Sequence, residues 1–140
     1  MRTVERSRFV RAGPDVVARQ LSPWTIVEYE GTFTVLDVEE REDEGEWTVR
    51  AAARGLETTL RFERLEESDG FYYEQEGDAG PLDTMETTLT HRPENEGTRV
   101  SVSSTVSLGL RPAFLSDRIA GWKRDGELER ALERLADDVE

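Results

Sequence analysis

The amino-acid sequence predicts an α+β protein in which a curved, seven-stranded antiparallel sheet wraps around a long C-terminal helix. Three observations indicate this fold class. Between residues 31 and 108, apolar and polar side chains alternate with a period of two, which is typical of strands with one buried face. Polar turns interrupt the alternation every 10 to 15 residues, a spacing that allows hairpins but no parallel crossovers. Residues 112–139 instead carry apolar side chains at steps of three and four, as in a helix.

The N-terminal segment predicts a strand followed by a helix. Weak alternation indicates a strand at 3–10, and "AGPDVVARQL" then begins a helix. Pro14 suits the first helical turn, where its missing N–H costs no hydrogen bond, and Asp15 lies at the positive end of the helix dipole. Pro23 disfavours helical geometry in the residue before it, so the helix should end there. A short second turn or loop carrying Trp24 should follow.

The stretch after residue 31 predicts six consecutive strands in a meander. The clearest hairpin joins "TFTVLDVEE" to "WTVRAAARG", and the last strand lies within "EGTRVSVSSTVSLG". Some polar side chains fall on otherwise apolar faces, namely Thr58, Gln75, Thr87 and Ser104. A buried polar group needs a hydrogen-bond partner, and we expect neighbouring side chains or water in that role more than a ligand.

The C-terminal helix carries two apolar runs that we expect to form one stripe against the sheet. The first run is Leu115, Ile119 and Trp122, and the second is Leu128, Leu132, Leu135 and Val139. The runs are slightly out of phase across Gly126, where we expect a kink or a tight approach. One helix about 10 Å across cannot cover so large an apolar sheet. Large side chains should therefore fill the remaining space, or a cavity should be left there.

Length and composition indicate a single domain spanning residues 1–140. The chain is long enough to bury a core without disulfides, and it contains no cysteine. The first residues lack the apolar stretch of a signal peptide, and no run reaches the ~18 apolar residues of a membrane span. We therefore expect a cytoplasmic protein with no membrane insertion.

The charge is strongly negative, with 31 acidic and 18 basic residues and a net charge of −13. Such a field repels nucleic acid and anionic membrane surfaces. Lys123 is the only lysine, and low lysine with abundant acid resembles proteins of salt-loving microbes. We therefore favour a halophilic archaeon as the source over an ordinary acidic protein of a GC-rich genome. Melting temperatures that rise from low salt to molar KCl would support this interpretation, and constant ones would contradict it.

Several motifs that would identify an enzyme or a metal site are absent. The sequence contains no G-x-G-x-x-G, no G-x-x-x-x-G-K-[ST], no H-E-x-x-H and no G-x-S-x-G. The acidic turns at 39–46 and 78–83 lack the D-x-[DN]-x-[DN]-G ladder of calcium loops, so we interpret them as solvated turns. His91 is the only histidine, which excludes a multi-histidine metal site within one chain. We expect no bound metal.

The order of elements resembles the START-like, helix-grip superfamily, also called SRPBCC. The resemblance rests on "VERSRFVRAGPDVVARQL", on "EGTRVSVSSTVSLG" and on the terminal helix, and it covers essentially the whole chain. That superfamily includes polyketide cyclases and aromatases, Bet v 1-like proteins and START lipid-transfer domains. The resemblance implies the order β-α-(α)-β6-α and an apolar or aromatic small molecule bound beneath the long helix. It implies neither a shared catalytic residue nor a cofactor.

Bulky side chains on the apolar faces are the candidates for the cavity wall. The expected ligand-binding residues are Trp24, Trp47, Phe62, Tyr73, Met85, His91 and Trp122. The Tyr73 hydroxyl could orient a ligand, whereas the alternative is that the whole set packs as a solid core. His91 is the one candidate for a catalytic base or a polar anchor at the cavity mouth. Its alternative role is a rim histidine bonded to a backbone carbonyl.

The sequence favours binding of a hydrophobic small molecule, such as a lipid, a quinone or a polyketide. Few titratable groups are expected to face inward, which is why we favour a binding protein over an enzyme. The first alternative is a polyketide cyclase/dehydratase-type enzyme without cofactor, which a buried acid–base pair beside the cavity would favour. The second is an interaction module of the Hsp90-activator or respiratory-complex-partner type, which an exposed apolar patch would favour. The sequence predicts no oligomeric state.

Overall fold

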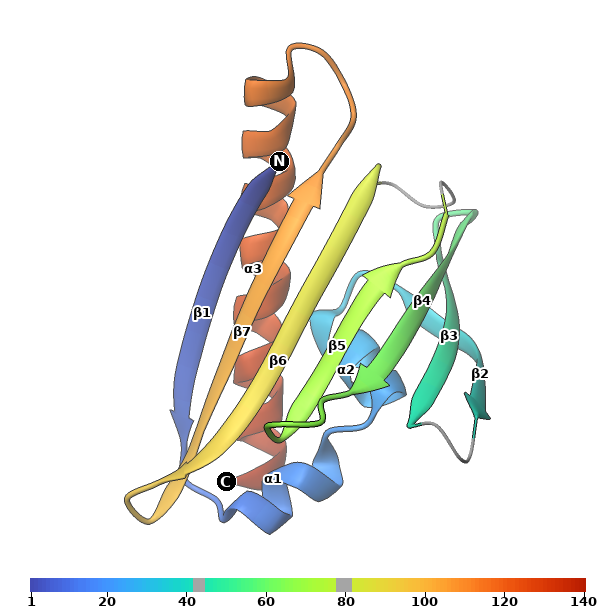
Figure 1. Cartoon of the computed structure of the whole chain (residues 1–140). Coiled ribbons are helices and arrows are strands. Elements are labelled where there is room, and N and C mark those ends of the chain that lie inside the picture. Colours follow the sequence, from blue (N-terminus) through green and yellow to red (C-terminus); the bar gives the residue numbers. More distant parts are fainter. Residues whose placement is uncertain (42–44, 78–81) are drawn as a thin grey trace.

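The computed structural model describes residues 1–41, 45–77 and 82–140, which form one sheet of seven strands and three helices (Figure 1). The elements are β1 (Arg2–Val10), α1 (Pro14–Gln20), α2 (Pro23–Glu30), β2 (Thr34–Arg41), β3 (Glu46–Ala53), β4 (Leu56–Arg64), β5 (Gly70–Gln75), β6 (Thr84–Glu94), β7 (Gly97–Ser107) and α3 (Ala113–Val139). The predicted α+β fold with its long C-terminal helix is confirmed.

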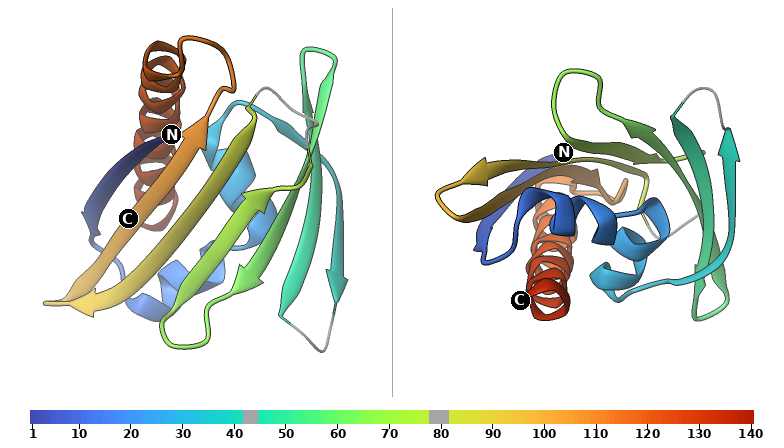
Figure 2. Two further views of the ribbon diagram at one scale, coloured as in Figure 1. Left: turned by 45° about the horizontal axis from the view of Figure 1, so that its top comes forward. Right: turned by 90° about the horizontal axis from the view of Figure 1, so that it is seen from below.

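The sheet is antiparallel throughout, in the order β1-β7-β6-β5-β4-β3-β2. Strands β2 to β7 form the predicted meander, and β1 pairs with β7 at the edge, with Arg2 opposite Val106. The sheet bends so that all three helices lie on its concave side (Figure 2). This curvature follows from the twist that every strand adds to its neighbour.

Alternation along the strands places the apolar side chains on this concave face. Along β7, Val100, Val102, Ser104 and Val106 are buried, and the positions between them are partly exposed. Trp47 and Val49 of β3 are buried in the same way. The predicted division of each strand into one apolar and one polar face is therefore confirmed for these strands.

The helix α3 departs from the prediction in its first half. Leu128, Leu132 and Leu135 are buried against the sheet, whereas Leu115 and Trp122 of the other run are 48% and 81% exposed. At about 100° per residue the two runs lie on opposite sides of the helix, so the expectation of a single stripe is wrong. Small and polar residues instead face the sheet in the first half, among them Ser116, Asp117, Ala120, Gly121 and Arg124.

Of the kink or tight approach expected at Gly126, the tight approach is absent. The helix α3 runs without interruption from Ala113 to Val139. A Cβ atom added at Gly126 would meet nothing within 4 Å, so no neighbouring element approaches closely there. The glycine lies on an open part of the helix surface.

The short helix α2 positions an acidic side chain against α3. It begins at Pro23, where the Ser22 hydroxyl accepts a hydrogen bond from the Thr25 N–H at 3.3 Å. It ends at Gly31, which has φ of 81° in the left-handed region that favours glycine. A Cβ atom there would lie 2.7 Å from Arg130 Nε, so glycine also lets α3 approach. The last residue of α2, Glu30, is consequently buried beside α3.

The acidic turns at 39–46 and 78–83 lie partly outside the described residues. Over the described ranges, no group of three or more acidic or histidine side chains is arranged to hold a metal ion. Within the same ranges, no helix combines the length and apolar character that crossing a membrane requires.

Candidate functional site

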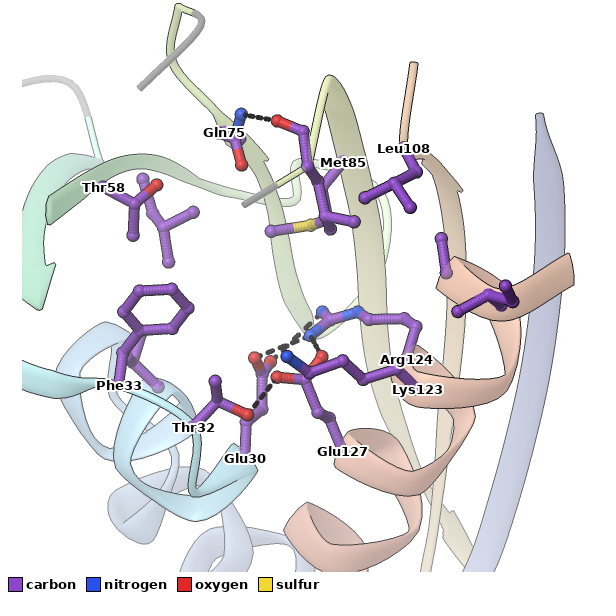
Figure 3. A pocket seen from close by; sticks show the side chains of 15 residues that line it. Glu30, Thr32, Phe33, Thr58, Gln75, Met85, Leu108, Lys123, Arg124 and Glu127 are labelled. Carbon is purple, nitrogen blue, oxygen red and sulfur yellow. Dashed lines mark hydrogen bonds and ion pairs between the residues drawn. The ribbon is translucent and has the colours of Figure 1, made fainter. Parts of the chain in front are cut away.

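A cavity of about 240 Å³ lies between the concave face of the sheet and the first half of α3 (Figure 3). Its walls come from the end of α2, strands β4 to β6 and α3. The lining residues are Val27, Glu30, Thr32, Phe33, Thr58, Leu60, Gln75, Leu82, Met85, Leu108, Ile119, Ala120, Lys123, Arg124 and Glu127. Most of this surface is apolar, and the charged side chains gather on the side formed by α2 and α3.

Arg124 is the centre of the polar wall. Its side chain is 3% exposed and forms a two-bonded ion pair with Glu30, with Nη1–Oε1 at 2.7 Å and Nη2–Oε2 at 3.2 Å. Each charge would be costly to bury alone, and the paired geometry offsets that cost. The ion pair joins the middle of α3 to the end of α2.

The sheet supplies the remaining partners of the Arg124 guanidinium. Its Nε donates to Ser104 Oγ at 2.9 Å, and Nη2 donates to Thr87 Oγ1 at 2.8 Å. The Tyr73 hydroxyl accepts from Nη2 at 3.1 Å and donates to Glu30 Oε2 at 2.5 Å. Thr87 and Ser104 are also 2.7 Å apart and share a hydrogen bond. The polar positions expected to find side-chain partners on β6 and β7 therefore do so.

A second carboxylate, Glu127, flanks the ion pair. Its Oε1 accepts from Arg124 Nη1 at 3.4 Å, and its Oε2 accepts a hydrogen bond from the Thr32 hydroxyl. The polar wall thus holds two carboxylates around one guanidinium. Lys123 lines the same cavity from an exposed position on α3, which places its ammonium group at the rim.

Burial and pairing together keep the protons of this network in place. Burial lowers the pKa of Arg124, but the neighbouring Glu30 and Tyr73 raise it further, so the net pKa is above its usual value. Burial and the Glu30 charge raise the pKa of Tyr73 well above 10. The guanidinium and the phenol are therefore both protonated at neutral pH, and their hydrogen-bond pattern does not change there.

Two polar atoms on the wall have capacity left for a ligand. Gln75 Nε2 donates to the Leu82 carbonyl oxygen at 2.7 Å, which turns the amide oxygen toward the cavity (Figure 3). Over the described ranges that oxygen accepts no hydrogen bond, and Lys123 has no ion-pair partner. An acceptor and a cation are thus available on an otherwise apolar surface.

The predicted ligand-binding residues divide into four groups in the structure. Met85 lines the cavity, and Tyr73 lies behind Glu30, one hydrogen bond from it. Phe62 and Trp47 are core residues: Phe62 stacks on Tyr73 with ring centroids 4.3 Å apart, and Trp47 packs edge-on against Phe71. These contacts fill the space beside the cavity.

Two of the predicted tryptophans lie at the surface. Trp24 in α2 is 42% exposed, and Trp122 points away from the sheet on the outer side of α3. The expectation that both reach the interior is wrong: the sequence defines no face for the turn that carries Trp24, and the apolar spacing of α3 does not define whether Trp122 faces the sheet. Neither side chain lines the cavity.

His91 lies in a different place from the cavity mouth where it was expected. It is six residues after Met85 on β6, about 20 Å along the strand. There it lines a separate hollow under α1, together with Asp15, Arg64 and Asp69. Its Nδ1 is buried without a partner among the described residues, so the alternative role, a ring bonded to a backbone carbonyl, is not met at that atom.

The residues that sequence reasoning missed are Glu30, Arg124 and Glu127. One signal could have identified Arg124: Thr87 and Ser104 are paired polar residues on two neighbouring apolar strand faces. Such a pair indicates a buried polar side chain opposite, and only a residue of the covering helix can supply it. No comparable signal marks Glu30, since its burial depends on the turn at Gly31.

Comparison with known proteins agrees with this architecture. A family model described as "Polyketide cyclase / dehydrase and lipid transport" matches residues 1–140. No curated protein sequence matches the chain. A START superfamily protein from Mycobacterium smegmatis has a TM-score of 0.68 at 13% identity, with 99% of each chain covered.

Two further structures share the fold. The protein TTHA0849 from Thermus thermophilus has a TM-score of 0.72 at 23% identity, covering 99% of this chain and 97% of that one. The di-domain ARO/CYC protein BexL from the BE-7585A biosynthetic pathway has a TM-score of 0.64 at 22% identity, covering 94% of this chain and 45% of its own. These likenesses show the START-like fold alone. They lend no support to the halophilic source expected from composition.

Replacing Arg124 with methionine should strongly destabilise the fold. The Arg124→Met variant leaves Glu30 and Glu127 buried without their cation, which should lower the free energy of unfolding by about 3–5 kcal/mol. The control Arg118→Met removes an exposed arginine from the same helix and should change it by less than about 0.5 kcal/mol. Urea denaturation measures both values. Equal, small losses in the two variants would contradict the role assigned to the ion pair.

The stability of the protein should depend on the protonation of His91. Burial lowers the pKa of His91 in the folded state, and nearby Asp69 offsets only part of this shift. The unfolded chain therefore binds the proton first as the pH falls through 6.5, and the free energy of unfolding decreases until the folded pKa is passed. In a pH series of denaturation curves, His91→Asn should lose this decrease. A wild type and variant with parallel pH profiles would show that the burial of His91 has no energetic effect.

Proposed function

Because the chain belongs to the family described as polyketide cyclase / dehydrase and lipid transport, we propose that it binds a hydrophobic small molecule beneath α3. The observation that carries the proposal is the apolar cavity of about 240 Å³ between α3 and the sheet. Side chains as small as Ala120 face it from the helix, so the interior is not filled there. An unfilled apolar space of this size is costly unless a ligand occupies it.

The volume sets the size of the ligand. An apolar cavity of about 150 Å³ accepts one benzene ring, so this cavity has room for roughly two fused rings. It is smaller than the ~300–1,000 Å³ of sites for larger ligands. A ring compound or the ring end of a quinone therefore fits, whereas a longer lipid or polyketide chain would extend past Lys123 into solvent. The Gln75 amide oxygen and the Lys123 ammonium would orient a hydroxyl or carbonyl group on the ring.

The polar network supports binding more than catalysis. Arg124 and Tyr73 hold their protons at neutral pH, and their hydrogen-bonding atoms are already engaged within the protein. Efficient proton transfer needs a group whose pKa lies near the working pH. We therefore assign the network to holding α3 in position and forming a fixed polar floor for the ligand.

A cyclase/dehydratase-type enzyme is the second candidate. It is favoured by the two carboxylates, Glu30 and Glu127, on the wall of a cavity that could fold a flexible polyketone. Either carboxylate could take up a proton from such a substrate. Release of a cyclised product by the wild type but not by Glu127→Gln would support this function. Recovery of the polyketone unchanged would contradict it.

A cavity-filling substitution tests the proposed function. We expect 1-naphthol, which has two fused rings and one hydroxyl group, to bind the wild type in calorimetric titrations. In Ala120→Phe the new ring occupies the same space, so the affinity should fall by at least about tenfold. Ala18→Phe adds the same ring on an exposed helix face and should bind like the wild type.

The comparison is valid only for folded protein, which circular dichroism and a cooperative melting curve establish for each variant. Equal affinities of folded Ala120→Phe and wild type would place the ligand outside the cavity and contradict the proposal.

A further inference from the structure

The first half of α3 and the loop before it expose an unusual number of large apolar side chains. The described residues include nine exposed large hydrophobic side chains, and five of them lie within this one segment. They are Leu110, Phe114, Leu115, Ile119 and Trp122, which we call the α3 patch. Contiguous exposed apolar side chains of this kind mark a contact surface rather than ordinary surface variation.

The charge around the α3 patch is opposite to that of the whole chain. Residues 111–124 contain four basic residues and one acidic residue, Asp117, which is buried and accepts a hydrogen bond from the Leu108 N–H at 3.3 Å. Arg111, Arg118 and Lys123 are exposed, and none has an ion-pair partner over the described ranges. Residues 125–140, in contrast, contain seven acidic and two basic residues. One acidic side chain, Asp83 just before β6, packs against Gly109 in the loop before α3.

The α3 patch adjoins the mouth of the cavity. Ile119 belongs both to the patch and to the cavity lining, and Lys123 and Leu108 border the two. The first turns of α3 and the preceding loop extend past the ends of the strands, at the top of Figure 1. A molecule that leaves the cavity between these side chains would emerge at the patch.

From these observations we propose that the α3 patch is a peripheral membrane-binding surface that seats the cavity mouth on an anionic lipid bilayer. Aromatic and aliphatic side chains next to arginine and lysine are the combination that inserts shallowly into the headgroup layer. A second copy of the chain is a poorer occupant, since a two-fold interface would bring the same three cations of each copy together. The proposal that a ligand passes between bilayer and cavity rests on the proposed function, whereas binding of the patch to lipid does not.

The net charge of −13 does not prevent this contact. The 27 residues of α3 span about 40 Å, and apart from the buried Asp117 the acidic residues of the helix begin at Asp125, on the C-terminal side of the patch. At physiological ionic strength the Debye length is about 8 Å, so acidic groups farther than this from the patch act only weakly on a bilayer that touches it. The expected repulsion from anionic membranes was based on the net charge alone and took no account of how the charges are distributed along α3.

Vesicle flotation tests the proposal directly. The wild-type chain should float with vesicles of phosphatidylcholine and phosphatidylglycerol in equal amounts, and more weakly with phosphatidylcholine alone. The double variant Phe114→Ser/Trp122→Ser should lower the partition coefficient by about tenfold or more, because two large rings no longer insert. The control Leu36→Ser/Leu56→Ser removes two exposed apolar side chains from β2 and β4 and should leave the partition coefficient unchanged.

The cationic side chains have a separate signature. Each of Arg111→Gln and Arg118→Gln should weaken partitioning onto the mixed vesicles by about fivefold and leave partitioning onto phosphatidylcholine almost unchanged. Arg19→Gln and Arg92→Gln change exposed arginines on α1 and β6 and serve as matched controls. Equal losses in all four variants would show a general charge effect and overturn the assignment to the patch.

Two outcomes would overturn the proposal while leaving the proposed function intact. In the first, the wild-type protein binds 1-naphthol but floats with neither kind of vesicle, which would show that it has no membrane-binding surface. A wild-type dimer that Phe114→Ser/Trp122→Ser converts to a monomer, seen by sedimentation, would assign the patch to contact between copies. Conversely, Phe114→Ser/Trp122→Ser should still bind 1-naphthol as the wild type does, and failure to bind it in all forms would count against the cavity instead.

Discussion

The buried ion pair between Arg124 and Glu30 is the interaction on which the rest of the structure depends. It joins α3 to α2, and through Thr87, Ser104 and Tyr73 it joins both helices to the middle of the sheet. A buried charge of this kind tolerates only small displacements, because a shift of an ångström would leave donors unpaired in a medium of low dielectric. The pair therefore sets the distance between α3 and the sheet.

The position of the cavity follows from what each half of α3 presents to the sheet. In the second half, Leu128, Leu132 and Leu135 fill the core. In the first half, the small Ala120 and the hydrogen-bonded Arg124 face the sheet in place of leucines, and an unfilled space remains. The large apolar residues of that half are mostly exposed instead and belong to the α3 patch, with Ile119 at the border of the cavity. The cavity and the patch thus have one cause: the apolar side of α3 faces the sheet in its second half and mostly faces away from it in its first half.

The sequence predicted the strands well because their burial pattern is local. Alternation with a period of two assigns each side chain of β7 or β3 to a face without knowledge of any partner. The helix α3 was harder, since a spacing of three and four residues shows that Leu115, Ile119 and Trp122 share a side but not which side faces the sheet. The site residues were mostly missed, because Glu30 and Arg124 meet from segments 94 residues apart.

The two halves of α3 differ in what they present to the sheet and to solvent. Its second half is acidic, and the inner side of that half is packed as core. Its first half combines the polar wall of the cavity, the only lysine at its rim and the exposed apolar side chains beside its mouth.

The most direct measurement is a crystal structure of the protein with a brominated naphthalene, in which anomalous scattering locates the bromine. We expect one strong peak in the space bounded by Leu60, Met85 and Ala120, with the Arg124–Glu30 ion pair unchanged. A peak confined to the hollow under α1, or side chains filling the space beneath α3, would contradict binding in the cavity.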